Sequence, residues 1–361
     1  MTKAEIALQR LHQQQLSQQV FEKPEEVVGW LGAVQAQDFG GAKWAVSQRT
    51  TGLTDSALEQ AFARGAILRT HILRPTWHFV TPADIRWILS LMAPRVKAFN
   101  AYYYRRLELD EAVFALSSAV LVKALQGGKQ LTRSELGVIV QNAGIDTRDL
   151  LRLTYIMLHA ELEAVVCSGA RRGKQFTYAL LDERASQTNF LDHDRALAEL
   201  TRRYFTGHGP ATINDFVWWS GLTAADAKAG LEMVSPQLAH EVIDDQTYWF
   251  PASMPLAASK SPVAHLLPNF DEYIVGYTDR TAAFDMQDTK MANPRDNIVF
   301  NQTLLIDGRV SGTWKRTINK GQVLLKTSTF ARLSPDDESA LATAVRRYGE
   351  FHDLPVLLDY N

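Results

Sequence analysis

At 361 residues, the chain is too long for one small domain and predicts two or three modules. Its hydrophobic share of 46% and charged share of 22% are ordinary for a globular protein, and a single cysteine, Cys167, excludes an intramolecular disulfide framework. The net charge of −2, from 38 basic and 40 acidic residues, argues against indiscriminate polyanion binding but leaves room for a local basic face.

Motifs that mark several function classes are missing from the sequence. No apolar run is long enough to cross a membrane, and the polar, amphipathic N-terminus lacks a secretory pattern. The chain has no CxxC, HExxH, Gly-rich phosphate loop or GxSxG motif, so zinc, nucleotide hydrolysis and serine esterase chemistry have no support. We therefore predict a cytoplasmic protein without metal or cofactor.

The first part of the chain predicts several helices. They are expected at 3–19 and 24–34, and the second opens at Pro24 because proline suits a first helical turn. The pattern breaks at "QAQDFGG", an extended or turn segment, before "AKWAVSQRT" resumes the helical period. The next helix is bounded by Thr54 as N-cap and Gly65 as stop.

A hairpin and a second round of the same pattern follow. Two short β-rich runs in "AILRTHILRPTWHFVTPAD" meet at Arg74-Pro75, and a long helix is expected at 82–107. Helices followed by a two-stranded hairpin is the order of a winged helix. In the next round, Thr132 and Glu135 predict a capping box in "LTRSELGVIVQNAG", and "VVCSGARRGKQFTYAL" predicts a hairpin with a basic turn.

The pattern occurs a third time and gives way to a β-rich end. A helix at 189–206 precedes "GPATINDFVWWSGL", where Thr212 caps a short helix, and "HEVIDDQTYWF" supplies the strands. Residues 251–260 are expected to be a linker. The remainder predicts strands with a hairpin turn at Asp307-Gly308 and a final helix at about 335–350.

These rounds predict three tandem winged helices rather than a short-period solenoid. The fold class is α+β and mainly helical. The predicted domains are three winged helices followed by a β-rich α+β segment: 1–108, 109–186, 187–255 and 256–361.

Basic side chains gather in three places that could follow a phosphate backbone. They lie in the second hairpin turn, in a third-round helix and in "GTWKR": Arg171, Arg172 and Lys174; Arg202 and Arg203; Lys315 and Arg316. The alternative for the hairpin is a solvated turn, since hairpin tips are often basic.

Histidines and carboxylates offer weaker patterns. His71 and His78 flank Arg74 and could converge on one face of adjacent strands; a metal would need a third ligand, and buried, hydrogen-bonded histidines are the alternative. A glycosidase needs two facing carboxylates, and no motif pairs Asp38 with another acid such as Asp271.

Gln35 and Gln37 stand on either side of Ala36 in a largely apolar segment. Amides at i and i+2 share one face only where the backbone is extended. Such a pair either caps backbone groups or holds a ligand. Because the chain is rich in glutamine, the pair alone does not distinguish these two roles.

Five ordered motifs, spanning about residues 5–350, make the chain resemble the AlkZ-like winged-helix DNA glycosylases, bacterial repair enzymes that excise alkylated and sometimes crosslinked purines. The motifs are "AVQAQDFGGAKWAVSQRT", "ILRTHILRPTWHFVTPAD", "GPATINDFVWWSGL", "LLPNFDEYIVGYTDR" and "DGRVSGTWKR". The resemblance implies that the three winged helices form a concave, DNA-facing surface. It also implies a catalytic Gln-apolar-Gln motif, matched by Gln35, Ala36 and Gln37. Another branch has Asp where this chain has Gln37, so the chain resembles the two-glutamine branch.

The implied chemistry suits two amides. Alkylation at purine N7 or N3 makes the base cationic and a good leaving group, so no strong general acid is needed. Glutamine carbonyls can then hold the attacking water and stabilise positive charge on the sugar, although an amide cannot take up the proton.

The sequence therefore predicts a monomeric, monofunctional DNA N-glycosylase for double-stranded DNA carrying cationic N7- or N3-alkylated purines, a class that extends to bulky adducts and interstrand crosslinks. It would associate with the bacterial nucleoid when on DNA. Gln35 and Gln37 are the predicted catalytic residues. The predicted pocket and supporting residues are Asp38, Arg49, His71, Arg74, Thr76, His78, Asp271 and Tyr273. The alternatives are a non-enzymatic winged-helix transcriptional regulator and a protein-interaction scaffold.

Overall fold

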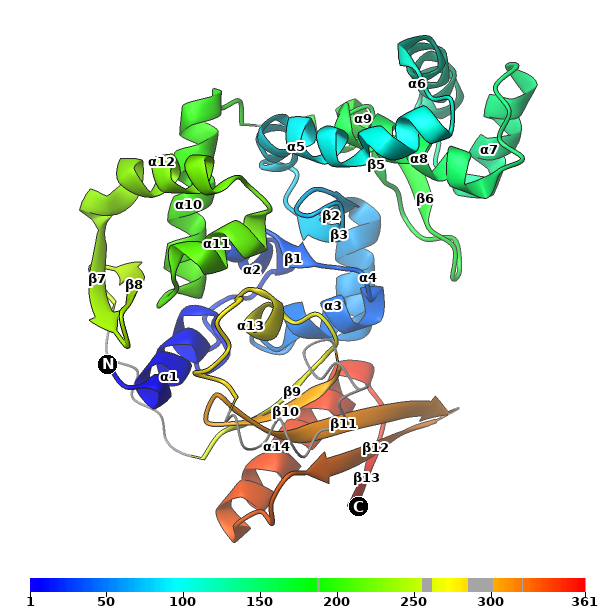
Figure 1. The fold of residues 1–361 in the computed structure, drawn as a ribbon. Helices are drawn as coiled ribbons and strands as arrows, with labels where there is room; N and C mark the ends of the chain where they lie inside the picture. Colours follow the sequence, from blue (N-terminus) through cyan, green and yellow to red (C-terminus); the bar gives the residue numbers. More distant parts are fainter. Residues whose placement is uncertain (187–188, 255–261, 285–300, 320, 361) are drawn as a thin grey trace. The chain divides into compact units, whose positions relative to one another are not determined.

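The computed structural model describes residues 1–186, 189–254, 262–284, 301–319 and 321–360 (Figure 1). They form an α+β fold, as predicted, and none of the described helices is long and apolar enough to cross a membrane. The chain divides into two compact units. Unit 1 consists of Met1–Glu59 and Ala198–Asn361, and unit 2 is the intervening segment Gln60–Leu197.

The first helices of unit 1 begin at residues that suit a helix start. A capping box at Thr2 opens α1 (Lys3–Gln13), and proline occupies the first turn of α2 (Pro24–Leu31). The side chain of Asp38 caps α3 (Phe39–Ser47).

Two of these helices are shorter than the sequence predicted. The helix expected at 3–19 ends before Gln15, which has a positive φ of 60°. The helix expected at 24–34 ends before Gly32, whose φ of 80° is accessible to glycine at no steric cost. In both cases a residue outside the right-handed helical region stops the hydrogen-bond ladder.

One element order occurs three times along the chain: a helix, a short extended piece, two helices and a two-stranded hairpin. The first copy comprises α2, β1 (Val34–Gln35), α3, α4 (Asp55–Arg64), β2 (Leu68–His71) and β3 (Trp77–Val80). The second comprises α6 (Glu111–Leu125), β4 (Leu131–Thr132), α7 (Arg133–Asn142), α8 (Leu150–Leu162), β5 (Val166–Ser168) and β6 (Thr177–Leu180). The third comprises α10 (His193–His208), a bridge at Ala211, α11 (Ile213–Ser220), α12 (Ala224–Val234), β7 (Leu238–Ile243) and β8 (Gln246–Pro251).

The predicted recurrence of helices followed by a hairpin is therefore present. The short extended piece is a feature that the sequence did not reveal: β4 pairs with β6, and Ala211 pairs with Trp249 of β8. Between the copies lie α5 (Ile85–Arg106), near the predicted range 82–107, and the short α9 (Leu181–Arg184). The assignment of three separate winged-helix domains stays a prediction.

Predicted caps and stops mark several of these helices correctly. Thr54 Oγ1 accepts the Ala57 backbone N–H at 3.2 Å, and α4 ends before Gly65, where φ is 84°. Capping boxes are present at Thr132 and at Thr212. Local hydrogen bonding therefore decides these boundaries.

The C-terminal part of unit 1 is a five-stranded sheet in the order β13-β12-β11-β10-β9, antiparallel except between β12 and β13. Helix α14 (Pro335–His352) joins the two parallel strands. The strands are β9 (Ala264–Leu267), β10 (Thr303–Ile306), β11 (Arg309–Asn319), β12 (Gln322–Thr329) and β13 (Val356–Tyr360). The predicted hairpin turn is confirmed by positive φ angles of 48° at Asp307 and 80° at Gly308.

Helix α3 packs against this sheet and its helix. The Tyr348 ring of α14 lies 4.9 Å from the Trp44 ring and 5.1 Å from the Trp314 ring. Both indole N–H groups donate to backbone carbonyls of β9, at Leu266 and Leu267. These contacts fix the helix that follows the glutamine pair. Of the linker predicted at 251–260, β8 includes Pro251, and 255–260 lie outside the described residues.

Candidate active site

The glutamine pair lies where β1 turns into α3. Gln35 is the last residue of β1 and is 8% exposed, Ala36 is fully buried, and Gln37 is exposed. The predicted extended conformation is thus present at Gln35, but the chain bends at Gln37 and Asp38. The two amides therefore differ in environment, one anchored in the core and the other open to solvent.

A buried carboxylate holds the backbone of Gln35. Glu272, the first residue of α13 (Glu272–Val275), is fully buried, and its Oε1 accepts the Gln35 N–H at 2.7 Å. Its Oε2 accepts the Trp219 indole N–H at 2.9 Å and lies 3.5 Å from His208 Nε2. Glu272 therefore supports the candidate site, and the predicted set did not include it because its partners come from distant parts of the chain.

The neighbouring acid, Asp271, forms a buried ion pair with Arg49. The two guanidinium nitrogens donate to its carboxylate at 2.7 and 3.0 Å. Arg49 also donates to Gln14 Oε1 at 2.8 Å and to the Ala45 carbonyl at 2.8 Å. Two-point pairing fixes geometry as well as charge. It joins α3 to the turn that carries Glu272.

Tyr273 anchors the other side of that turn. Its hydroxyl donates to the Gly308 carbonyl at 2.7 Å, and burial raises its pKa. The side chain lies in a core cluster with Leu11, Leu267 and Leu305. Tyr273 therefore supports the site through packing.

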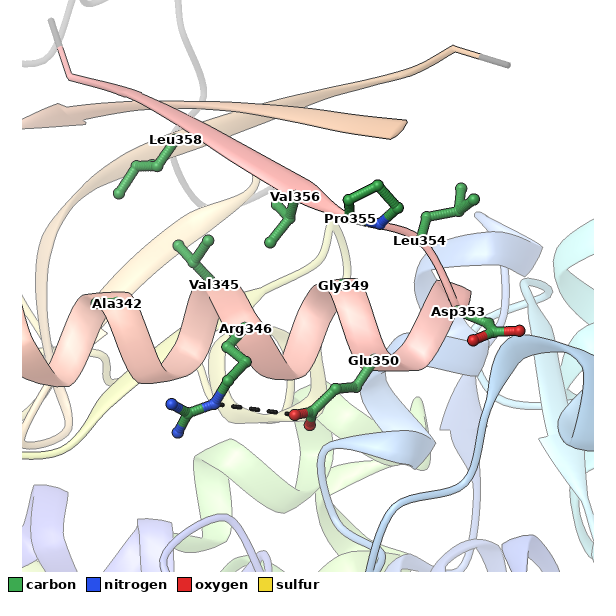
Figure 2. Close-up of a pocket in the computed structure, with 10 residues that line it drawn as sticks. All are labelled: Ala342, Val345, Arg346, Gly349, Glu350, Asp353, Leu354, Pro355, Val356 and Leu358. Carbon is green, nitrogen blue, oxygen red and sulfur yellow. Dashed lines mark ion pairs between the residues drawn. The ribbon is translucent and has the colours of Figure 1, made fainter. Parts of the chain in front are cut away.

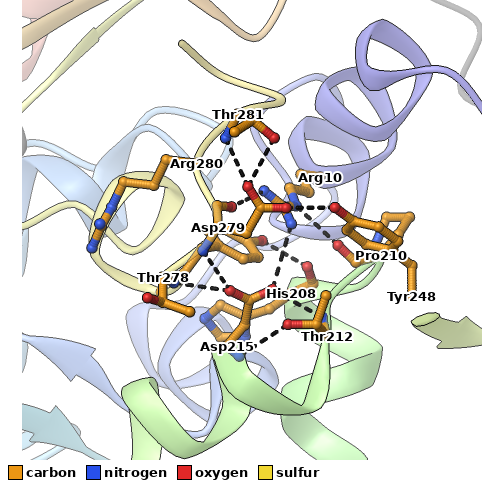
Figure 3. Close-up of polar contacts among 12 residues, drawn as sticks. Arg10, His208, Pro210, Thr212, Asp215, Tyr248, Thr278, Asp279, Arg280 and Thr281 are labelled. Carbon is orange, nitrogen blue, oxygen red and sulfur yellow. Dashed lines mark hydrogen bonds and ion pairs between the residues drawn. The ribbon is translucent and has the colours of Figure 1, made fainter. Parts of the chain in front are cut away.

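A buried polar network secures the rest of this segment (Figure 3). Asp215 Oδ1 accepts the backbone N–H groups of Thr278 at 2.9 Å and Asp279 at 2.8 Å. Arg10 donates to the carbonyls of Pro210 at 2.9 Å and Asp279 at 3.1 Å. Residues 278–279 are thus tied to α1 and α11. Glu272, at the start of the same stretch, bonds to Gln35.

Asp38 is occupied by the helix that it caps. Its Oδ1 accepts the Gly41 N–H at 3.1 Å, and its Oδ2 lies 4.0 Å from a guanidinium nitrogen of Arg316. A Cβ on Gly40 would lie 3.5 Å from the same Arg316 group. One of the predicted DNA-binding cations, Arg316, therefore stands beside the glutamine turn, whereas Lys315 is exposed on β11.

Arg202 and Arg203, the other predicted DNA-binding cations of unit 1, have intramolecular partners. Arg202 donates to both oxygens of Glu199 at 2.8 and 2.9 Å, and Arg203 donates to the same carboxylate at 2.7 Å. Arg203 also donates to the Gly29 carbonyl at 3.3 Å. These contacts join α10 to α2. DNA contact by Arg202 and Arg203 stays a prediction.

In unit 2, the idea that His71 and His78 converge on one face is wrong. In the β2–β3 register, His71 lies opposite Trp77 and Thr70 opposite His78, so the two imidazoles point to opposite faces. His71 Nδ1 lies 2.7 Å from Glu161 Oε2, and His78 is fully buried with Nδ1 2.9 Å from the Thr76 carbonyl.

The other two predicted pocket residues of unit 2 lie in the same hairpin loop. Arg74 has a positive φ of 51°, and Thr76 Oγ1 donates to the Leu73 carbonyl at 3.0 Å. They shape the tight turn between β2 and β3.

The basic hairpin turn of unit 2 is present. Arg172 donates to Glu135 Oε1 at 2.8 Å and to the Gln130 carbonyl at 2.8 Å, and this pairing lowers the pKa of Glu135 to about 2. The Arg171 guanidinium lies 5.4 Å from the Phe176 ring, and Lys174 is exposed. Contact with DNA by this turn stays a prediction.

A hollow of about 660 Å³ lies elsewhere in unit 1, between α14 and β13 (Figure 2). Val345 and Val356 line it, and its Arg346 pairs with Glu350 at 3.8 Å. None of the predicted site residues lines this hollow, so it is separate from the glutamine turn.

Residues 28–351 match the family model for DNA glycosylase AlkZ-like proteins. The chain belongs to this family. It is 24% identical over 327 residues, 85% of each chain, to an interstrand DNA cross-link repair glycosylase of Streptomyces sahachiroi. Its fold is similar to that of the Streptomyces sahachiroi DNA glycosylase AlkZ, with a TM-score of 0.80 and 21% identity over 99% of this chain and 100% of that one.

Family membership confirms the resemblance seen in the motifs. It supports a DNA N-glycosylase over the transcriptional regulator, with DNA as the partner. The AlkZ-like chain also shares the α+β fold of the solved relative.

Proposed function

We propose that this AlkZ-like protein hydrolyses the N-glycosidic bond of cationic N7- or N3-alkylated purines in double-stranded DNA, with Gln35 and Gln37 as its catalytic residues. The observation that carries the proposal is the strand-to-helix turn that carries both glutamines. Glu272 holds the Gln35 backbone from within the core, and Gln37 is exposed.

The two amides divide the work according to their environments. Gln37, as the exposed member, meets the sugar and accepts a hydrogen bond from the attacking water. Gln35 is held in place and adds a second carbonyl dipole beside the positive charge that develops on the sugar. Fixed dipoles of this kind stabilise a transition state without reorganisation cost.

The environment of Asp38 also fits a substrate whose leaving base is already cationic. Its carboxylate caps α3 and lies near Arg316, so it is a poor candidate for a general base. An alkylated purine leaves without protonation, and the water then needs placement more than activation. Bulky adducts and interstrand crosslinks are included in the proposed substrate class, because the Streptomyces sahachiroi relative is named an interstrand DNA cross-link repair glycosylase.

The proposed working form is a monomer on the nucleoid. Three cations that are open to solvent are proposed to follow the phosphate backbone: Arg172, Lys174 and Lys315. A single chain with a repeated helix-and-hairpin order has several surfaces for this contact, so no dimer is required.

Base excision from a duplex with one N7-methylguanine tests the proposal. We expect wild-type protein to release the base and Gln35→Ala and Gln37→Ala to lose at least about 100-fold in rate while still binding the duplex. Gln126→Ala, an exposed glutamine on unit 2, is the matched control and should be fully active. An inactive wild type on this lesion and on a crosslinked duplex would contradict the proposal.

A borohydride trapping experiment tests the monofunctional assignment. Attack by water predicts that no covalent protein–DNA complex forms. A trapped complex would instead show an amine nucleophile and a lyase step.

A further inference from the structure

Unit 2 contains a cavity that the glutamine site does not use. It has a volume of about 390 Å³ and is lined by parts of the β2–β3 hairpin, the start of α7 and the β5–β6 hairpin. The lining residues are Arg69, Trp77, Thr132, Arg133, Ser134, Ser168, Lys174, Gln175, Phe176, Thr177 and Tyr178. Its volume falls in the range of small-molecule sites, which is about 300–1,000 Å³.

The cavity wall is positively charged. Arg69, Arg133 and Lys174 contribute to it, and no acidic side chain is among its lining residues. Arg133 bonds to neutral oxygens, those of the Leu150 carbonyl and the Thr154 hydroxyl. Within the described parts of the chain, Lys174 has no hydrogen bond or ion pair.

Two carboxylates around this wall also have partners outside it, and Glu161 in addition acts electrostatically on Arg69. Glu161 accepts hydrogen bonds from the backbone and the ring of His71, at 2.9 and 2.7 Å. Glu135 closes the capping box of α7 and pairs with Arg172. Glu161 offsets part of the Arg69 charge, and the lining residues themselves contribute three cations and no carboxylate.

Aromatic rings line the same cavity. The Arg69 guanidinium is only 6% exposed and lies 4.0 Å from the Trp77 ring centre and 4.5 Å from that of Phe176. Burial lowers the pKa of Arg69 to about 10, and the Glu161 carboxylate opposes part of this shift. Tyr178 supplies a third ring. Flat apolar surface and cationic side chains thus occur side by side in this cavity.

We propose that this cavity binds one nucleotide, with the phosphate on the cations and the base against the aromatic rings. Bases stack on aromatic side chains regardless of their identity, and arginine and lysine hold phosphate. The nucleotide can come from solution or from a DNA strand with one unit out of the stack, and the DNA source rests on the proposed function. The hydroxyl groups of Ser134 and Ser168 are available for the sugar or the base edge.

Calorimetric titration of the full-length protein tests this site. Deoxyguanosine 5′-monophosphate should bind more tightly than deoxyguanosine or inorganic phosphate alone. Lys174→Ala and Phe176→Ala should each weaken that binding by about tenfold. The matched controls are Lys123→Ala and Phe99→Ala, exposed residues of the same unit that do not line the cavity.

A second arm separates the two sources. This arm uses Phe176→Ala, because Lys174 is also proposed to contact the phosphate backbone of a paired duplex. If Phe176→Ala weakens binding to a duplex with one bulged guanosine but not to a fully paired duplex, the nucleotide belongs to a DNA strand. If it weakens only the binding of the mononucleotide, the occupant is free in solution. Unchanged affinities for all probes would overturn the proposal. The proposal would also be overturned if inorganic phosphate bound as tightly as the nucleotide and if Phe176→Ala left the phosphate affinity unchanged.

The excision assay keeps this inference distinct from the proposed function. If the glutamine variants lose excision but still bind the nucleotide, the result bears only on the proposed function of unit 1. Intact excision in wild type with no nucleotide binding overturns the cavity proposal alone.

Discussion

At the scale of single residues, Glu272 shows how a buried carboxylate can hold the backbone of a candidate catalytic residue. Its two oxygens accept N–H groups from Gln35 and Trp219, so the acid fixes a strand and a helix together. In Glu272→Gln, one oxygen becomes an amide N–H₂ that must face another donor. We expect the single-turnover excision rate to fall by about tenfold or more, with DNA affinity unchanged.

The control for this prediction is Trp219→Phe. It removes one donor but leaves the bond between Glu272 and Gln35 intact, so excision should fall much less. Equal losses in the two variants, following equal losses in thermal stability, would show that Glu272 matters only for folding.

His265 gives a pH-dependent prediction for stability. The residue is buried, neither ring nitrogen has a hydrogen-bond partner among the described residues, and burial lowers its pKa from 6.5 to about 3. The unfolded chain binds a proton below about pH 6.5, whereas the native state does not. Stability should therefore fall as the pH drops from 6.5, by roughly 2 kcal/mol at pH 5.

Urea unfolding at pH 7.5 and pH 5 measures this effect. His265→Phe should reduce the difference between the two pH values, and His193→Gln, an exposed histidine, should leave it unchanged. An unaltered difference in His265→Phe would contradict the prediction.

At the scale of elements, the first turn of α3 contains two adjacent glycines with different surroundings. A Cβ on Gly41 would lie 2.9 Å from Asp38 Oδ2 and 3.1 Å from Pro268 Cβ. A Cβ on Gly40 would have its nearest neighbour at 3.5 Å, an ordinary contact. Gly41→Ala should therefore disturb the Asp38 cap and reduce excision, whereas Gly40→Ala should be tolerated.

Alanine is favoured over glycine in a helix by about 1 kcal/mol, so both variants would gain stability from propensity alone. Thermal unfolding and single-turnover excision, measured together, separate this gain from the steric effect. A Gly41→Ala protein as stable and as active as Gly40→Ala would show that the cap tolerates the extra methyl group.

Local signals in the sequence predicted much of the element order because they act over a few residues. Thr54, Thr132 and Thr212 each bond to a backbone N–H three residues on, which a sequence displays directly. The opposed faces of His71 and His78 depend on strand register, which the hairpin loop sets, and the sequence did not reveal it. Glu272 was missed for a related reason, since its partners lie in β1 and α11.

At the scale of the whole molecule, the chain divides into two compact units. Unit 2 is one continuous stretch, whereas unit 1 is assembled from both ends of the chain. The Arg49–Asp271 pair and the Glu272–Gln35 bond join those ends, because each spans more than 200 residues of sequence. Composition and periodicity describe neighbours in sequence, so they could not predict that the candidate site needs both ends of the chain.

Each unit has a core of its own, which predicts two unfolding transitions. Leu121 and Ile156 lie in a core cluster of unit 2, and Leu267 and Leu305 lie in one of unit 1. Leu121→Ala should lower the free energy of unfolding of one transition by about 3 kcal/mol, and Leu305→Ala that of the other. Calorimetry of the full-length variants checks this.

The two transitions also connect stability to the two proposed sites. Unit 1 contains the glutamine turn, and unit 2 contains the proposed nucleotide cavity. A mononucleotide that binds unit 2 only in its folded state should raise the transition that Leu121→Ala lowers and leave the other unchanged, since ligand binding stabilises by mass action. A single transition, shifted alike by both leucine variants, would show that the units unfold together and that these effects cannot be assigned to either one.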